Sequence, residues 1–299
     1  MSARSALLGA GYLALWRAVS LMPDRLAYKT MESLFALQYR TNAAQTQRLR
    51  ETFAPVVDEA DLEKTVEEAY RWYARYWAEA FRLPAVSREE LDSRFTVDGV
   101  EHIQGAIDAG RGGILATMHL GNWDTGGRWV ASRWPMTAVA ERLEPRALFE
   151  RFLGYRRELG MKIIPLEKGR DVTGACAELL RANELVALLA DRDLSGRGVP
   201  VRFFGRTAKM ARGPAVLAAR TGAPVLPAVI YQREDGAHHA VVNPPLPPTA
   251  DESPEALATT IQRLAEAYEA FVRVAPAQWH MFQRFWPDEA NLASTESAA

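Results

Sequence analysis

Apolar residues recur at helical spacing throughout residues 1–95 of the chain. The strongest pattern covers residues 64–84, where Pro84 ends it. Its large apolar residues are three or four positions apart: Val66, Tyr70, Tyr73, Trp77 and Phe81. Such a stripe is typical of a helix face that packs into a core, and it also suits one wall of a hydrophobic groove. We therefore expect an N-terminal helical part at residues 1–95.

The beginning of the chain combines apolar positions at helical spacing with basic residues around them. The apolar positions are Leu7, Leu8, Tyr12, Leu15, Trp16 and Val19, and the basic ones are Arg4, Arg17, Arg25 and Lys29. Arg17 interrupts the apolar run, which is shorter than the roughly 20 residues that span a bilayer. An amphipathic helix that lies in the membrane interface would show this pattern. A helix packed on the protein's own core would show the same pattern, and the sequence leaves both interpretations open.

From about residue 95 the pattern changes to short apolar runs that alternate with amphipathic segments. The apolar runs, which predict strands, are residues 112–119, 136–142, 161–166, 184–193, 223–231 and 238–246. The amphipathic segments, which predict helices, are residues 122–133, 146–159, 171–183, 213–222 and 254–274. This alternation implies right-handed crossovers and a mostly parallel central sheet flanked by helices. We therefore predict one α/β domain over residues 1–290, with its α/β part at 96–290 and a disordered tail at 291–299.

The composition supports a large core and excludes some classes of site. Of the 299 residues, 48% are hydrophobic, which is enough to bury a substantial core. The net charge of -1 gives no overall field that attracts nucleic acid, so any attraction to an anionic surface must come from local clusters. Cys176 is the only cysteine, which excludes an internal disulfide and a multi-cysteine zinc site. Its place in a helical pattern predicts a buried apolar residue.

Ionisable residues end three of the predicted strands. His119 and Asp191 each follow the apolar stretch of a strand. Glu141 and Arg142 end a third strand in the same way. Ligands of an open α/β sheet bind beyond the carboxyl ends of its strands, and core packing does not explain charged groups there. We therefore expect a site at this edge of the sheet. The other histidines lack the spacing of metal ligands, so we expect no metal there.

His119 and Asp124 form a candidate general base and its orienting carboxylate. Asp124 lies five residues after His119, in the first turn of the next predicted helix. From there its carboxylate can accept a hydrogen bond from one imidazole nitrogen, which fixes the tautomer and leaves the other nitrogen free as a base. Because the helix dipole also favours an acidic residue in a first turn, capping alone would explain Asp124 as well.

The chain has no G-x-S-x-G elbow, and no serine or cysteine nucleophile is evident. His119 would then activate an acceptor hydroxyl for direct attack on a reactive acyl group. A thioester suits this reaction because its leaving group is good. Backbone N–H groups near Gly121 and Asn122, at the start of the predicted helix, are candidates for stabilising the oxyanion.

A run of basic residues follows Asp191. It consists of Arg192, Arg197, Arg202, Arg206, Lys209 and Arg212. Basic side chains in a loop at a strand end suit phosphates. A solvated and partly salt-bridged surface loop is the alternative. We favour phosphate binding because the run begins at Asp191, within the predicted site.

Several separated motifs occur in the same order as in a known family. They are HLGNWD at 119–124, ER at 141–142 with a following helix that ends in RRELG, LADRDLSGRGVPVRFFG at 189–205, and GPAVLAARTGAPVLPAVIY at 213–231. From about Leu7 to Trp286 the chain resembles the bacterial lipid A biosynthesis acyltransferase family. ARYWAEAFRLP at 74–84 and PAQWHMFQRFW at 276–286 resemble its actinobacterial phosphatidylinositol mannoside acyltransferase branch in particular.

The resemblance implies a glycerolipid-acyltransferase-like fold and a reaction. His119 would be the general base on a mannose hydroxyl, with Asp124 as its partner. A long-chain acyl-CoA such as palmitoyl-CoA would be a substrate, with no separate cofactor, and a phosphatidylinositol mannoside would be the acceptor. The protein would be peripheral, on anionic phospholipids at the cytoplasmic face of the plasma membrane.

The resemblance also marks residues for binding. We assign Asn122, Arg142 and Arg156, in or beside the matching motifs, to the donor or acceptor, together with the basic run. Asp191, which we count with His119 and Asp124 as catalytic, stands where the branch commonly carries a glutamate that is thought to contact the acceptor sugar. Its carboxylate is one methylene shorter, which leaves its contact, and with it the acceptor, open.

Three alternatives remain open from the sequence. The first is the same chemistry on a lipid A precursor or another polar lipid. The second is a non-catalytic lipid-binding or scaffolding protein, against which the presence of His119, Asp124 and Asp191 speaks. The third is a hydrolase that passes the acyl group to water.

Overall fold

The computed structural model describes residues 3–141, 146–167, 169–193 and 196–287 of the chain. Arg142, for which the sequence predicts a binding role, lies outside these residues. The predicted disordered tail at 291–299 lies outside them as well.

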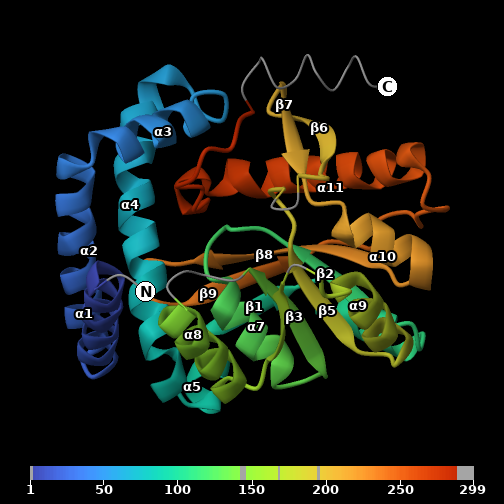
Figure 1. The fold of residues 1–299 in the computed structure, drawn as a ribbon, viewed down its shortest axis with the longest axis horizontal. Coiled ribbons are helices and arrows are strands. Elements are labelled where there is room, and N and C mark those ends of the chain that lie inside the picture. Colours follow the sequence, from blue (N-terminus) through green and yellow to red (C-terminus); the bar gives the residue numbers. More distant parts are fainter. Residues whose placement is uncertain (1–2, 142–145, 168, 194–195, 288–299) are drawn as a thin grey trace.

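A seven-stranded sheet forms the centre of the fold, with the strand order β1-β9-β8-β2-β5-β3-β4 (Figure 1). Its strands are β1 (Phe95–Asp98), β2 (Gly113–Thr117), β3 (Met136–Glu141), β4 (Lys162–Leu166), β5 (Leu185–Leu189), β8 (Val225–Gln232) and β9 (His238–Val242). All neighbouring pairs are parallel except β8 and β9, which are antiparallel. The predicted α/β fold with a mostly parallel sheet is therefore confirmed.

Helices cover both faces of this sheet. One face packs on α9 (Val172–Arg181), α10 (Gly213–Thr221) and α11 (Pro254–Val274), and the other on α6 (Val100–Asp108), α7 (Trp123–Ala131) and α8 (Arg146–Glu158). Because neither face meets water, the central strands are near-continuous apolar runs, and β8 is buried at every position. Cys176 is buried in α9, as its pattern predicts. A separate antiparallel hairpin, β6 (Val199–Phe203) and β7 (Arg206–Met210), packs beside α11.

The predicted N-terminal helical layer is also confirmed. It consists of α1 (Ala3–Ser20), α2 (Asp24–Thr41), α3 (Ala43–Phe53), α4 (Glu59–Arg82), the 3-10 turn η1 (Leu83–Ala85) and α5 (Arg88–Ser93). Helix α4 packs against α1, α2 and α3, which stand together at one end of the sheet (Figure 1). The sequence left open whether its aromatic stripe packs into the core or lines a groove, and the structure shows that it does both. Tyr70 and Phe81 are buried in the core, whereas Tyr73 and Trp77 line a cavity.

Helix α1 packs on the protein's own core along its described apolar positions. The Trp16 ring stacks on Phe81 with 4.7 Å between ring centroids, and Val19 is fully buried. Large apolar side chains are exposed next to it instead: Leu21, Leu26, Leu34 and Leu37, just after α1 and along α2. Within the described residues, no helix is both long and apolar enough to cross a membrane.

Candidate active site

His119 lies in a sharp turn that follows β2. Gly121 in this turn has a φ of +65°, and a Cβ there would lie 1.7 Å from the Ile230 carbonyl oxygen of β8. Only glycine allows the turn to approach β8 this closely. The Gly121 N–H donates to the Gln278 carbonyl (2.9 Å) and the Asn122 N–H donates to the Ile230 carbonyl (3.0 Å). These two amides are therefore occupied, and the prediction that they bind the oxyanion is wrong for this arrangement.

Asp191 is the carboxylate that contacts the His119 imidazole. Its Oδ1 lies 2.7 Å from Nδ1 of His119, and its Oδ2 accepts the His119 backbone N–H at 3.1 Å. Strands β2 and β5 are neighbours, with Thr117 opposite Leu189. His119 and Asp191 each lie two positions beyond this pair, so they lie side by side. Within the described residues, no hydrogen bond engages the other ring nitrogen, Nε2, and His119 lines the large cavity.

Asp191 is held as a buried anion. It has no exposed surface, and burial by itself would raise the pKa of its carboxyl group. The charge of His119 and the hydrogen bonds from His119 and from the Trp279 indole outweigh that effect and hold the pKa below its ordinary value. An ionised acceptor at Nδ1 favours the imidazole tautomer that leaves Nε2 unprotonated and able to take a proton.

Asp124 does not orient His119, and this prediction needs correcting. Its Oδ1 accepts from the Arg156 Nε at 2.8 Å and its Oδ2 accepts from the Tyr76 hydroxyl at 2.9 Å. Asn122, not Asp124, caps α7, because its side chain accepts the Thr125 N–H at 3.0 Å. The carboxylate in the first turn therefore faces α8 and α4 instead of folding back onto the turn.

Arg156 and Asp124 form a buried ion pair in the wall of the same cavity. Their side chains are 17% and 2% exposed. Burial alone would lower the pKa of the Arg156 guanidinium. The charge of Asp124 and its hydrogen bond outweigh burial and raise this pKa above its usual value. Arg156 therefore stays charged, and it lines the cavity as the assignment to substrate binding requires.

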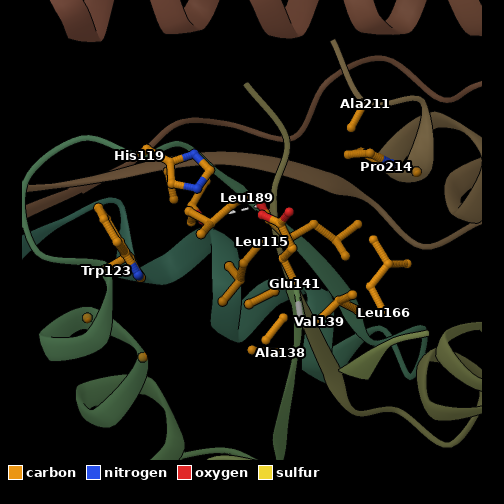
Figure 2. A pocket seen from close by; sticks show the side chains of 18 of the residues that line it. Leu115, His119, Trp123, Ala138, Val139, Glu141, Leu166, Leu189, Ala211 and Pro214 are labelled. Carbon is orange, nitrogen blue, oxygen red and sulfur yellow. Dashed lines mark hydrogen bonds between the residues drawn. The ribbon is translucent and has the colours of Figure 1, made fainter. Parts of the chain in front are cut away.

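A cavity of about 1180 Å³ opens beside His119. Figure 2 shows His119 and Trp123 on one side of it and Ala211 and Pro214 on the other. Apolar side chains from both faces of the sheet line its depth, among them Leu115, Trp129, Met136, Ala138, Leu188, Val216 and Ile230. Across the described residues, no group of three or more His, Cys, Asp or Glu side chains could hold a metal ion.

The predicted binding residues divide into two sets. Arg192, Arg197 and Arg212 line the cavity, and the Arg192 Nη2 lies 2.8 Å from the Glu141 carboxylate. Arg202 and Lys209 belong to the β6–β7 hairpin and are not part of the lining. The basic run thus reaches the site at its two ends but not in the hairpin between them.

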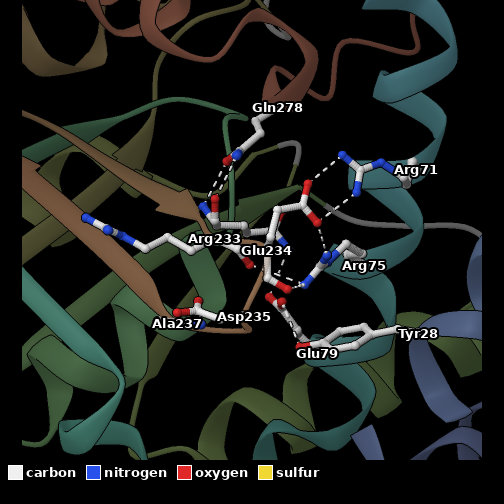
Figure 3. A network of polar contacts seen from close by, with 10 residues as sticks. Tyr28, Arg71, Arg75, Glu79, Arg233, Glu234, Asp235, Ala237 and Gln278 are labelled. Atoms are coloured by element: carbon white, nitrogen blue, oxygen red, sulfur yellow. Dashed lines mark hydrogen bonds and ion pairs between the residues drawn. The ribbon is translucent and has the colours of Figure 1, made fainter. Parts of the chain in front are cut away.

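Asn122 is likewise absent from the cavity wall, because a buried polar network holds it. Its Nδ2 donates to the Glu79 carboxylate at 2.7 Å, and the His238 Nε2 lies 2.9 Å from the same oxygen. Burial alone would raise the pKa of Glu79, but these partners lower it. Figure 3 shows Glu79 beside Tyr28 and close to Arg75. Arg71 and Arg75 of α4 both donate hydrogen bonds to the Glu234 carboxylate. Asn122 therefore has a structural role here.

The sequence reasoning missed several residues of the site. Tyr76 and the aromatic ring of Trp123 stand next to each other in the cavity wall, 4.3 Å apart between centroids. Trp279 reaches Asp191 from the far end of the chain. The motif PAQWHMFQRFW at 276–286 was a signal for this segment, but nothing in its spacing tied it to His119.

A family model described as bacterial lipid A biosynthesis acyltransferase matches residues 5–287. The phosphatidylinositol mannoside acyltransferase of Mycolicibacterium smegmatis is 38% identical over 281 residues, which cover 92% of this chain and 90% of the relative. The protein of the same name from Mycobacterium tuberculosis is 35% identical over 282 residues, covering 92% and 87%. The chain therefore belongs to the bacterial lipid A biosynthesis acyltransferase family.

Proposed function

We propose that this protein transfers a long-chain acyl group, palmitoyl in the first instance, from acyl-CoA to a mannose hydroxyl of a phosphatidylinositol mannoside. The observation that carries the proposal is the His119 imidazole, which contacts buried Asp191 through Nδ1 and lines a large cavity with a mostly apolar wall. The printed names of the relatives support the acceptor class.

In this mechanism His119 is the general base and Asp191 is its orienting carboxylate. The acceptor hydroxyl gives its proton to Nε2 while its oxygen attacks the thioester carbonyl, and Asp191 stabilises the imidazolium that forms. The C–S bond then breaks and the thiolate of CoA takes up the proton. Base catalysis of this kind is worth about 10²–10⁴-fold, so positioning and charge stabilisation must supply the rest. Arg156, a charged side chain in the cavity wall, is the candidate for stabilising the oxyanion.

The cavity suits a long acyl chain. Its lining between the sheet and α7 consists of apolar side chains such as Leu115, Trp129 and Ile230. Each methylene that leaves water for such a surface contributes about 0.8 kcal/mol. We infer that an acyl chain seated there would place its thioester carbon beside His119, which lines the same cavity. Arg192, Arg197 and Arg212 are the basic residues of the wall that could meet the phosphates of the donor.

We also propose that the protein lies on the cytoplasmic face of the plasma membrane through α2. The exposed apolar residues of this helix, Leu26, Leu34 and Leu37, have Arg25, Lys29 and Arg40 along the same helix. Apolar side chains flanked by basic ones are the combination that an anionic membrane surface attracts.

The direct test is a mass-spectrometric acyl-transfer assay with palmitoyl-CoA. The acceptors are phosphatidylinositol mono- and dimannoside, a lipid A precursor, and none. Palmitoylated mannoside as the main product supports the proposal. Transfer to the lipid A precursor alone rejects the acceptor, and CoA release that is as fast without acceptor as with it identifies a hydrolase. Absence of turnover with every acceptor, in a protein that binds these lipids, identifies a non-catalytic lipid-binding protein.

A further inference from the structure

The segment after α11 docks on the turn that carries His119. Trp279 forms an antiparallel bridge with Leu120. On either side of this bridge, the Gly121 N–H donates to the Gln278 carbonyl (2.9 Å) and the His280 N–H donates to the His119 carbonyl (2.7 Å). The backbone of the turn is therefore fixed by residues that lie about 160 positions further along the chain.

The side chain of Trp279 reaches Asp191 from this segment. Its indole Nε1–H donates to the Asp191 Oδ2 at 3.1 Å, and the residue has no exposed surface. Phe203 and Phe285 contact the indole edge to face, with ring centroids 5.7 Å and 4.8 Å away. These rings leave the indole little room to turn, so its N–H points at the carboxylate.

Asp191 depends on few donors. Its Oδ1 faces the His119 Nδ1, and its Oδ2 accepts from the His119 backbone N–H and from Trp279. A fully buried carboxylate stays ionised only where such hydrogen bonds replace water. The two donors on Oδ2 also fix the rotation of the carboxylate about its Cβ–Cγ bond. With Oδ2 anchored, Oδ1 is left to face the imidazole.

We propose that Trp279 is a positioning residue of the His119–Asp191 pair, and this inference rests on the proposed role of His119 as the base. Together with His119, the indole N–H stabilises the ionised form of Asp191, and it directs the Asp191 Oδ1 at the imidazole. Trp279 is not part of the cavity lining, so it acts through Asp191 and not on a substrate. The reaction would then require the C-terminal segment as well as the strand ends.

The test replaces Trp279 by phenylalanine, which keeps an aromatic ring and removes the N–H. Trp286→Phe is the matched control. Trp286 is buried, contacts Phe203 and Phe285, and donates its own indole N–H to the Thr52 carbonyl at 3.1 Å. Both variants lose one buried indole hydrogen bond and similar packing. Only Trp279→Phe removes a donor from the carboxylate.

We expect kcat for acyl transfer to fall about tenfold or more in Trp279→Phe, as for loss of one hydrogen bond to a charged group, with the KM values of both substrates nearly unchanged. The acid limb of the activity profile should move to higher pH, because an Asp191 carboxylate with one donor fewer stabilises the imidazolium form of the base more strongly. In an Asp191→Asn background the same substitution should cost little more. Trp286→Phe should leave kcat and the profile unchanged in both backgrounds. Equal effects of the two tryptophan substitutions would overturn the inference.

A second measurement needs no turnover. In protein labelled with ¹³C at the aspartate carboxyl groups, the Asp191 resonance is the one missing from Asp191→Asn. Its titration midpoint should rise in Trp279→Phe and not in Trp286→Phe, and an unmoved midpoint rejects the inference even where the wild-type protein proves not to transfer acyl groups. If Trp279→Phe does not fold, benzothienylalanine can replace Trp279, because it keeps the shape of indole and has sulfur in place of N–H. The inference then requires the same rise of the Asp191 titration midpoint in that variant.

Discussion

Two buried carboxylates lie near His119, and their partners give them different tasks. Asp191 contacts the imidazole, whereas Asp124 is engaged by the Arg156 guanidinium and the Tyr76 hydroxyl. The first arrangement is the one that the proposed general base requires. The second keeps a charged arginine in the cavity wall and ties α7 to α8 and α4.

The two carboxylates should therefore respond differently to removal of their charge. Asp191→Asn should lower kcat by about 10²–10⁴-fold, because the imidazolium loses its counter-charge, while the protein stays folded. Asp124→Asn should chiefly lower the free energy of unfolding, by about 3–5 kcal/mol, because it leaves Arg156 buried without its partner. Urea unfolding and kcat per folded molecule, measured for both variants, check this. A larger loss of kcat in Asp124→Asn than in Asp191→Asn would restore Asp124 as the orienting residue.

At this scale the sequence predicts the base but not its partner. His119 and Asp191 can both be placed at strand ends from the alternation of apolar runs. Their contact depends on β2 and β5 being neighbours in register, although two strands separate them along the chain. Asp124 is closer to His119 along the chain than Asp191 is, and a single sequence gives no information on distances in space.

At the scale of elements, most helices and strands of the α/β part follow from periodicity, but β1 and α6 went unpredicted, and so did the path of the basic run. The pattern from Asp191 to Arg212 has no strong period, and the hairpin β6–β7 inside it went unpredicted. That hairpin carries Arg202 and Lys209 away from the cavity and packs beside α11, where the Arg202 backbone pairs with the Gln262 side chain. Arg212 follows the hairpin and returns to the cavity wall at the start of α10.

Charge reversal should separate these positions. Arg212→Glu should raise the KM for palmitoyl-CoA by about tenfold, because one phosphate contact to a charged group is lost and a repulsion is added. Arg202→Glu is the matched control on the hairpin, and it should leave that KM unchanged. Steady-state kinetics at a fixed salt concentration measure both. A donor KM that is the same in the two variants would remove Arg212 from the donor site.

At the scale of the whole molecule, the large apolar side chains that are described as exposed near the N-terminus lie on α2 and just before it, and none of them lies on α1. The described apolar side chains of α1, such as Trp16, are taken up by α4 and α8. Periodicity could not decide this, because a helix that packs on a core and a helix that packs on a membrane need the same stripe. Helix α2 in turn packs on α4, whose Tyr73 and Trp77 line the cavity. A membrane beneath α2 would thus lie one helix away from the substrate site.

Membrane binding should weaken when the exposed face of α2 loses its leucines. The double substitution Leu34→Ser and Leu37→Ser should weaken sedimentation with vesicles of anionic phospholipid by about tenfold or more, since one buried leucine is worth about 1.5–3 kcal/mol. Val274→Ser is the control, because Val274 is 71% exposed at the end of α11. If the double variant binds vesicles as tightly as the control, α2 is not the membrane contact.

The central claim is that His119 takes the proton from an acceptor hydroxyl. Its most direct test is mass-spectrometric acyl transfer from palmitoyl-CoA to phosphatidylinositol mannoside by wild-type protein, His119→Ala and the control His239→Ala, at matched amounts of folded protein. His239 is partly exposed on β9, where it contacts Thr96 and Asp98. The account predicts that transfer falls by at least about 10²-fold in His119→Ala and is unchanged in His239→Ala. Wild-type turnover by His119→Ala would contradict it.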